Sequence, residues 1–175
     1  MSKLRLVLVD DQALFREGLR TLLGLVSDFE IVGEARNGQE AIELARRCRP
    51  DVILMDLRMP GLGGVEATRA ISEAKLPARV LVLSTFDDDE EISAALAAGA
   101  IGYLLKDVPA EKLTEAIRLA ARGDSVLQPS VATKVVRQFA EWQNRQQKRA
   151  AQPLVEPLSA RELQVLEQLT SGKSN

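Results

Sequence analysis

The sequence predicts an α/β fold, a doubly wound five-stranded parallel sheet with helices on both faces. Strand-like and helix-like segments alternate five times before Gly123. The strand-like segments are apolar almost throughout, as expected for strands that are buried on both faces. Each strand is followed by a helical pattern, which implies crossover connections and a parallel sheet. At a length of 175 residues, right-handed crossovers favour a doubly wound sheet over a barrel.

Each element of this fold has its own local signal. The predicted strands are short apolar runs at residues 4–9, 30–35, 52–55, 79–83 and 101–105. Apolar residues at helical spacing predict helices within residues 14–26, 41–45, 65–71, 88–98 and 109–120. Pro50 ends the second helix, and Pro109 opens the fifth. The breaker-rich segment MPGLGG separates the third strand from the third helix.

The pattern changes after Gly123. Pro129 predicts the start of another helix. The apolar residues that share one face of this helix are Val131, Val135, Phe139 and Trp142. This face must bury against the sheet domain, the C-terminal segment or a second copy of the chain. Residues 143–149 are polar and indicate a solvated helix end or a linker.

The C-terminal segment has the signals of one short helix. Ser159 and Glu162 form a capping box, and Gly172 is a candidate C-cap, so we expect a helix over residues 160–171. The chain is therefore expected to contain a sheet domain at 1–123, a linker with a helix at 124–156 and the start of a further, incomplete domain at 157–175.

Composition excludes several classes of protein. Cys48 is the only cysteine, so no internal disulfide is possible, and the chain has no histidine. The net charge of −2 is not that of a nucleic-acid-binding surface. No apolar stretch approaches the roughly 20 residues of a membrane span. We expect a cytoplasmic protein without a membrane contact.

Polar residues gather where the predicted strands end. These residues are Asp10 and Asp11, Asp56, Ser84 and Thr85, and Lys106. Sites in doubly wound sheets form beyond the carboxyl ends of the strands, at a topological switch point. If the first and third strands are neighbours, three carboxylates share one small volume and repel one another unless they are protonated or bind a cation. Oxygen ligands without histidine or cysteine favour Mg²⁺.

This set of groups suits phosphoryl transfer to a carboxylate. A metal ion offsets the charge of the incoming phosphoryl group, a lysine neutralises another oxygen, and a hydroxyl donates to a third. An aspartate nucleophile is established chemistry. Each residue also has a simpler explanation: Asp10 or Asp11 as a helix cap, and Lys106 as a surface lysine. Asp56 is harder to explain structurally, because an apolar strand leads into it and a Pro-Gly loop follows.

Four segments carry a resemblance to a known family: LVLVDDQALFREGL, DVILMDLRMPGLGGVEATR, VLVLSTFDDDE and AAGAIGYLLKDVP. They resemble the signature blocks of bacterial response-regulator receiver domains, over residues 3 to 123. The segment PLSARELQVLEQLTSGKSN is similar to the start of a LuxR-type helix-turn-helix domain, as in the NarL/FixJ subgroup. The resemblance implies a flavodoxin-like sheet with the strand order 2-1-3-4-5.

The resemblance also implies a role for each residue at the strand ends. Asp56 matches the phosphoacceptor, Asp11 the direct ligand of Mg²⁺ (or Mn²⁺), and Asp10 its companion acting through water. Arg58 stands where the family uses a backbone carbonyl as a metal ligand, with Asp56 completing the metal set.

Three further positions match the part of the family site that responds to phosphorylation. Lys106 matches the lysine that pairs with the phosphoryl group, Ser84 the switch hydroxyl, and Tyr103 the aromatic residue that moves inward with it. Asp107 follows the lysine where many receivers have proline, so the sequence leaves the geometry of that peptide bond open.

The implied protein is a two-component response regulator, which is not a conventional enzyme and catalyses at most its own phosphorylation. Its donor would be a sensor histidine kinase, and phosphorylation would favour a homodimer that controls a DNA-binding transcription regulator. The helix that reads DNA is the second of a helix-turn-helix, so DNA binding is expected only of a longer, full-length form.

Three alternatives remain at this stage. A flavodoxin-like FMN carrier would need a phosphate-binding loop after the first strand, where Asp10 and Asp11 stand instead. An aspartate phosphatase would need a second aspartate where Arg58 stands. A receiver that acts by protein contact without phosphorylation is disfavoured by its complete acidic set, and only a test of Asp56 separates it.

Overall fold

A central parallel sheet organises the chain. In the computed structural model, which describes residues 3–151, the strands lie in the order β2-β1-β3-β4-β5-β6, and every neighbouring pair is parallel. The strands are β1 (Leu4–Val9), β2 (Phe29–Ala35), β3 (Val52–Met55), β4 (Arg79–Ser84), β5 (Gly102–Leu105) and β6 (Val126–Leu127). The predicted doubly wound sheet and its order 2-1-3-4-5 are confirmed.

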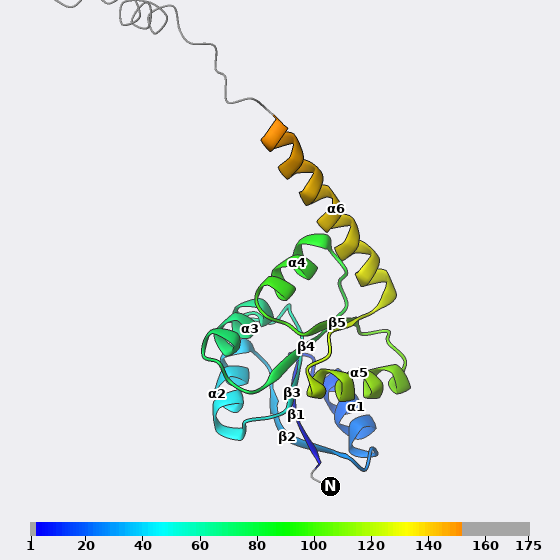
Figure 1. The fold of residues 1–175 in the computed structure, drawn as a ribbon. Helices are drawn as coiled ribbons and strands as arrows, with labels where there is room; N and C mark the ends of the chain where they lie inside the picture. The colour runs from blue at the N-terminus through cyan, green and yellow to red at the C-terminus, as the bar shows by residue number, and fades with distance from the viewer. Residues whose placement is uncertain (1–2, 152–175) are drawn as a thin grey trace, which may run out of the picture. The chain divides into compact units, whose positions relative to one another are not determined.

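Helices cover both faces of this sheet (Figure 1). They are α1 (Ala13–Gly24), α2 (Gly38–Cys48), α3 (Gly64–Glu73), α4 (Asp89–Ala97), α5 (Ala110–Arg122) and α6 (Pro129–Ala151). Helices α1 and α5 lie on one face, and α2, α3 and α4 on the other. This division follows from the change in strand order at β1, from which the chain winds in both directions.

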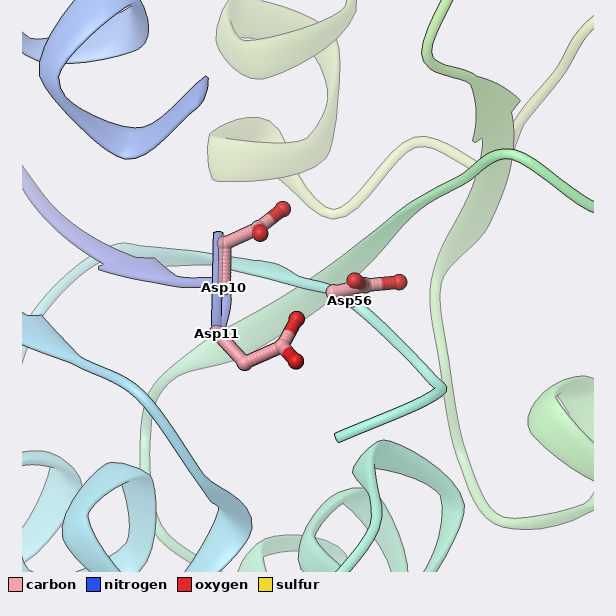
Figure 2. A group of neighbouring side chains, drawn as sticks. All are labelled: Asp10, Asp11 and Asp56. Atoms are coloured by element: carbon pink, nitrogen blue, oxygen red, sulfur yellow. The ribbon is translucent and has the colours of Figure 1, made fainter. Parts of the chain in front are cut away.

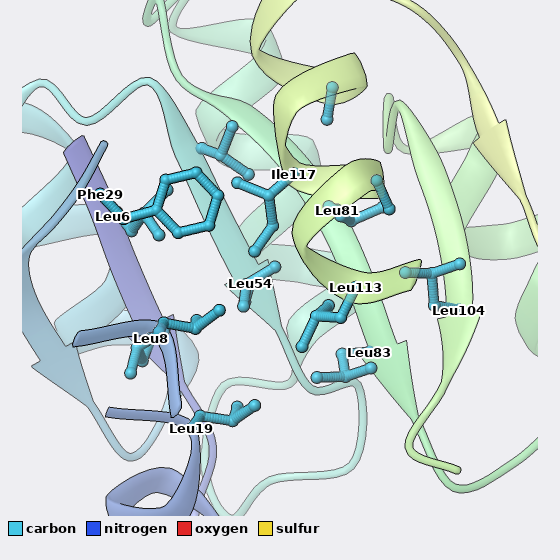
Figure 3. Close-up of a cluster of buried hydrophobic side chains, with 14 residues drawn as sticks. Leu6, Leu8, Leu19, Phe29, Leu54, Leu81, Leu83, Leu104, Leu113 and Ile117 are labelled. Carbon is cyan, nitrogen blue, oxygen red and sulfur yellow. The ribbon is translucent and has the colours of Figure 1, made fainter. Parts of the chain in front are cut away.

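Leucine-rich layers fill the space between sheet and helices. Figure 3 shows the layer under α1 and α5. Its labelled members are Leu6, Leu8, Leu19, Phe29, Leu54, Leu81, Leu83, Leu104, Leu113 and Ile117. A second layer packs β1 and β3 against α2 and α3. The apolar strands predicted from the sequence are therefore buried on both faces, which fixes the register that aligns their polar ends.

The structure extends the expected fold in one respect. A sixth strand, β6, pairs with β5 through Gly102–Val126 and Tyr103–Leu127. A strand of two residues carries no periodic pattern, so the sequence could not indicate it. The five-stranded expectation was therefore one strand short.

Helix α6 begins at Pro129 as predicted, but its apolar face is not uniform. Val131 is fully buried and Val135 partly buried, whereas Phe139 and Trp142 are 58% and 53% exposed. The face does not bury as one surface. The stacked rings of Phe139 and Trp142, 6.1 Å apart, instead contact each other.

The chain divides into two compact units, of which the first ends at Gln138 and the second begins at Phe139. The expected helix at 160–171 and its capping box lie outside the described residues. Among residues 3–151, no helix combines the length and the apolar character that a membrane span requires.

Candidate functional site

Three carboxylates meet at the carboxyl edge of the sheet. Asp10 and Asp11 follow β1, and Asp56 follows β3. The pairing of Val9 with Met55 sets these strand ends side by side, and the Asp56 amide donates to the Val9 carbonyl at 2.9 Å. One oxygen of each carboxylate lies within 4.8 Å of the others, and Figure 2 shows the three side chains as neighbours that extend towards the same side.

Lys106 lies between two of these carboxylates. It follows β5, and its amide donates to the Ser84 carbonyl at the end of β4. Its Nζ atom lies 2.6 Å from Asp10 Oδ2 and 3.0 Å from Asp56 Oδ2. The Phe15 ring of α1 covers the ammonium at 4.5 Å from the ring centroid. The side chain is only 6% exposed, so Lys106 is not a surface lysine.

Local hydrogen bonds orient the acidic residues. Asp10 Oδ1 accepts from the Gln12 amide at 2.8 Å, and Arg16 donates to the Asp10 carbonyl at 2.6 Å. Asp56 Oδ1 accepts from the Leu57 amide at 2.7 Å. The N-cap residue of α1 is Gln12, whose side chain makes no capping hydrogen bond. The interpretation of Asp10 or Asp11 as a helix cap is therefore wrong.

The loop after Asp56 approaches the start of α3 closely. A Cβ on Gly64 would lie 2.0 Å from the Asp56 carbonyl oxygen and 2.8 Å from Leu57 Cα. Only glycine fits at this distance, because both neighbours are backbone atoms. The glycine-rich part of MPGLGG thus lets the chain pass beside Asp56, and the Gly64 amide donates to the Leu57 carbonyl at 2.9 Å.

Burial and pairing perturb the ionisable groups of this site. Asp10 and Asp56 are 2% and 4% exposed. Burial is the main influence on the pKa of Asp56 and raises it, while hydrogen bonding to Lys106 acts in the opposite direction. Burial alone would lower the pKa of Lys106, but the hydrogen bonds to Asp10 and Asp56 outweigh it and raise that pKa. The lysine is therefore held in its charged form.

The donor set of this cluster fits a hard divalent cation. Three carboxylates offer oxygen ligands from a space of a few ångströms. Asp11 is exposed, which leaves one side of the cluster open to water, as magnesium requires. An acidic cluster of this kind is typical of the Mg²⁺ site of receiver domains.

The residues expected to respond to phosphorylation lie on the neighbouring strands β4 and β5. Ser84 ends β4, is fully buried, and its Oγ accepts from the Phe86 amide at 3.2 Å. Tyr103 on β5 is also fully buried and points inward, donating from its hydroxyl to the Phe86 carbonyl at 2.8 Å. Burial raises the pKa of Tyr103 to about 12. Both side chains therefore contact the loop between β4 and α4.

Arg58 makes contacts that sequence analysis missed. Its guanidinium lies 3.4 Å from the centroid of the Phe86 ring and pairs with Asp88 at 3.0 Å and Glu91 at 2.6 Å. These partners lie about thirty positions after Arg58 in the sequence, so no local sequence pattern indicates the contacts. The Arg58 side chain links the loop after β3 to the start of α4.

The backbone at Lys106 answers one open question from the sequence. No peptide bond within the described range 3–151 is cis, so Lys106 and Asp107 are joined by a trans bond. The lysine reaches the cluster with this geometry.

Comparisons with known proteins agree with this site. The profile of the response regulator receiver domain matches residues 6–118. The uncharacterized transcriptional regulatory protein YxjL of Bacillus subtilis is 42% identical over 174 residues, 99% of this chain and 78% of the relative. The response regulator protein VraR of Staphylococcus aureus is 40% identical over 172 residues, 98% of this chain and 78% of VraR.

Solved structures give the same result. The signal receiver domain of the putative response regulator NarL from Mycobacterium tuberculosis is 41% identical with a TM-score of 0.68. The match covers 70% of this chain and 99% of that structure.

Proposed function

Since this chain belongs to the response regulator receiver domains of two-component systems, among relatives of the NarL and LuxR type, we propose that Asp56 is its phosphoacceptor. The contact between Lys106 Nζ and Asp56 Oδ2, at 3.0 Å inside a cluster of three carboxylates, is the observation that supports this most. This contact supports the proposal because it brings a positive charge beside the carboxylate that would carry the phosphoryl group.

The residues that would hold Mg²⁺ (or Mn²⁺) are Asp10, Asp11, Asp56 and the backbone carbonyl of Arg58. Asp11 is the proposed direct ligand, and Asp10 acts through water. When bound, the ion supplies positive charge that offsets the repulsion between the acidic cluster and the incoming phosphoryl group.

The proposed reaction transfers one phosphoryl group from a phosphohistidine to Asp56. A carboxylate oxygen of Asp56 forms a bond to phosphorus while the P–N bond of a phosphohistidine breaks. The electron pair leaves with the imidazole nitrogen, which takes a proton from water. Lys106 neutralises one phosphoryl oxygen, and the hydroxyl of Ser84 donates to another. Lys106 already lies beside Asp56, so it can stabilise this charge with little movement during transfer.

The consequence of phosphorylation is a shift between two conformations. Ser84 must move towards Asp56 to donate to the phosphoryl group, and this movement alters the loop after β4 because its Oγ accepts from the Phe86 amide. Tyr103 in its inward position fits the space behind this loop. A ligand shifts such an equilibrium only by its different affinity for the two states. The acyl phosphate has this property, because only one state offers it the Ser84 hydroxyl.

A sensor histidine kinase is the proposed phosphodonor, and the proposed output is a homodimer that controls DNA binding in a longer form. The proposed receiver spans residues 1–123, with a linker at 124–156 and the start of a DNA-binding domain at 157–175. Light scattering with and without beryllofluoride tests the dimer, and an unchanged monomer in both would count against it.

The test of the acceptor is the intact mass after incubation with acetyl phosphate and Mg²⁺. The chain should gain the mass of one phosphoryl group, and Asp56→Asn should not. Asp51→Asn is the matched control, because Asp51 lies exposed at the opposite end of β3 and should leave the gain intact. A gain that persists in Asp56→Asn would remove Asp56 as acceptor and leave the receiver that acts by contact alone.

A further inference from the structure

The first ten residues of α6 are docked on the sheet domain. Residues 129–138 fall in the same compact unit as the sheet. Val131 is fully buried in the cluster that also contains Tyr103 and Val82, and Val135 packs against this cluster. The helix therefore covers the inward side chain of Tyr103, which is one of the residues proposed to respond to phosphorylation.

Polar contacts fix the same stretch of helix to the β4–α4 loop and to α4. Lys134 Nζ lies 2.6 Å from Asp87 Oδ2 and also donates to the Asp87 carbonyl. Arg137 pairs with Asp89 at 2.7 Å. Gln138 donates to the Asp89 carbonyl at 2.8 Å and accepts from the Ser93 hydroxyl. The ion pair with Lys134 lowers the pKa of Asp87.

The other side of this loop is held by the proposed site. Ser84 Oγ accepts from the Phe86 amide, and Tyr103 donates to the Phe86 carbonyl. Phe86 and Asp87 are adjacent, so one residue of the loop contacts the site and the next contacts α6. A movement of Ser84 towards Asp56 therefore reaches Lys134 through two consecutive peptide units.

We propose that the surface formed by the β4–α4 loop, α4 and Tyr103 is the docking site of residues 129–138, and that α6 docks more tightly when Asp56 is phosphorylated. This inference rests on the proposed function. Tighter docking on phosphorylation is proposed because Val131 of the helix and Tyr103 lie in one buried cluster. The docked helix favours the inward position of Tyr103, and the phosphorylated state is proposed to favour the same position. Linkage makes this effect reciprocal: helix contacts must also strengthen binding of a phosphoryl group.

The first experiment measures backbone hydrogen exchange of the whole chain, with and without beryllofluoride and Mg²⁺. Exchange in residues 132–138 should slow about fivefold or more, the lower end of typical coupling between sites. Asp56→Asn should show no such slowing.

The second experiment measures the beryllofluoride concentration at half saturation by ¹⁹F NMR. Lys134→Met keeps the apolar stem and removes the charge, and it should raise this concentration about threefold. Lys112→Met is the matched control, because Lys112 pairs with Glu115 on the exposed side of α5. Its value should equal that of the wild type.

The outcomes separate the two proposals. Wild-type protein that does not bind beryllofluoride overturns the proposed function and this inference with it. Wild-type protein that binds beryllofluoride with unchanged or faster exchange in residues 132–138 overturns only the inference. Equal half-saturation for Lys134→Met and Lys112→Met also overturns it.

Discussion

Replacing Lys106 by methionine tests the electrostatics of the site. The lysine is 6% exposed, and its carboxylate partners Asp10 and Asp56 have side chains 3% and 5% exposed. At 2.6 and 3.0 Å, each attraction amounts to about 6 kcal/mol at an effective dielectric of about 20. Desolvation offsets much of this attraction. Removing one partner of such a buried group still costs about 3–5 kcal/mol, because the remaining charges are left uncompensated.

Urea unfolding with EDTA at about pH 7.5 measures this cost. With an m-value of about 2 kcal/mol/M, the midpoint of Lys106→Met should fall by about 1.5–2.5 M. The loss should shrink as the pH falls, because burial raises the folded-state pKa of Asp56 above its unfolded value and its unpaired carboxyl group then takes up a proton. Added Mg²⁺ should also restore part of the stability. Equal midpoints for Lys106→Met and the exposed control Lys112→Met would refute the reasoning.

Three further perturbations follow from the same structure. Asp56→Asn should raise the urea midpoint at about pH 7.5, because burial raises the pKa of Asp56 and its charged form opposes folding above that pKa. This gain in stability should vanish as the pH falls below the ordinary carboxyl range. A lower midpoint for the variant at about pH 7.5 would contradict this reasoning. Gly64→Ala should destabilise the fold by about 3 kcal/mol, because its Cβ would clash with the backbone of Asp56 and Leu57. Gly18→Ala, with open space around its Cβ, should instead stabilise α1 by about 0.5–1 kcal/mol. Equal urea midpoints for the two variants would remove the steric argument. Tyr103, the only tyrosine, should ionise at about pH 12 in an absorbance titration followed together with circular dichroism, and a midpoint near 10 in folded protein would contradict its burial.

The sequence predicts this fold well because burial on both faces leaves a strong pattern. The strands at 4–9 and 52–55 are confirmed at both ends, and the others within one residue. The polar residues at their ends could be identified for the same reason: a carboxylate after an apolar strand departs sharply from its context. Asp10, Asp56 and Lys106 do meet, and the two ion pairs of the lysine show that the strand order was right.

The contacts of Arg58 and of α6 could not be predicted in the same way. Arg58 reaches Glu91 across 33 positions, and Lys134 reaches Asp87 across 47. Such pairs depend on where α4 settles on the sheet, which the periodicity of one segment does not determine. The split face of α6 has a similar origin: helical spacing places Val131 and Phe139 on one side but does not say how far a partner extends.

The helix at 160–171, the cytoplasmic location and the domain limits stay predictions. The first of these lies outside the described residues. The 78% coverage of YxjL and of VraR means that these relatives are longer than the match. The DNA-binding output therefore belongs to the proposal and not to the site described above.

The most direct test of the account is the position of the phosphoryl group. Acetyl phosphate and Mg²⁺ should form an acyl phosphate, which borohydride reduces to an alcohol, so the modified aspartate becomes homoserine. Tandem mass spectrometry of the digested protein should then find homoserine at position 56, between Met55 and Leu57. Homoserine at position 10 or 11, or aspartate unchanged at 56 in protein that has gained the phosphoryl mass, would contradict the account.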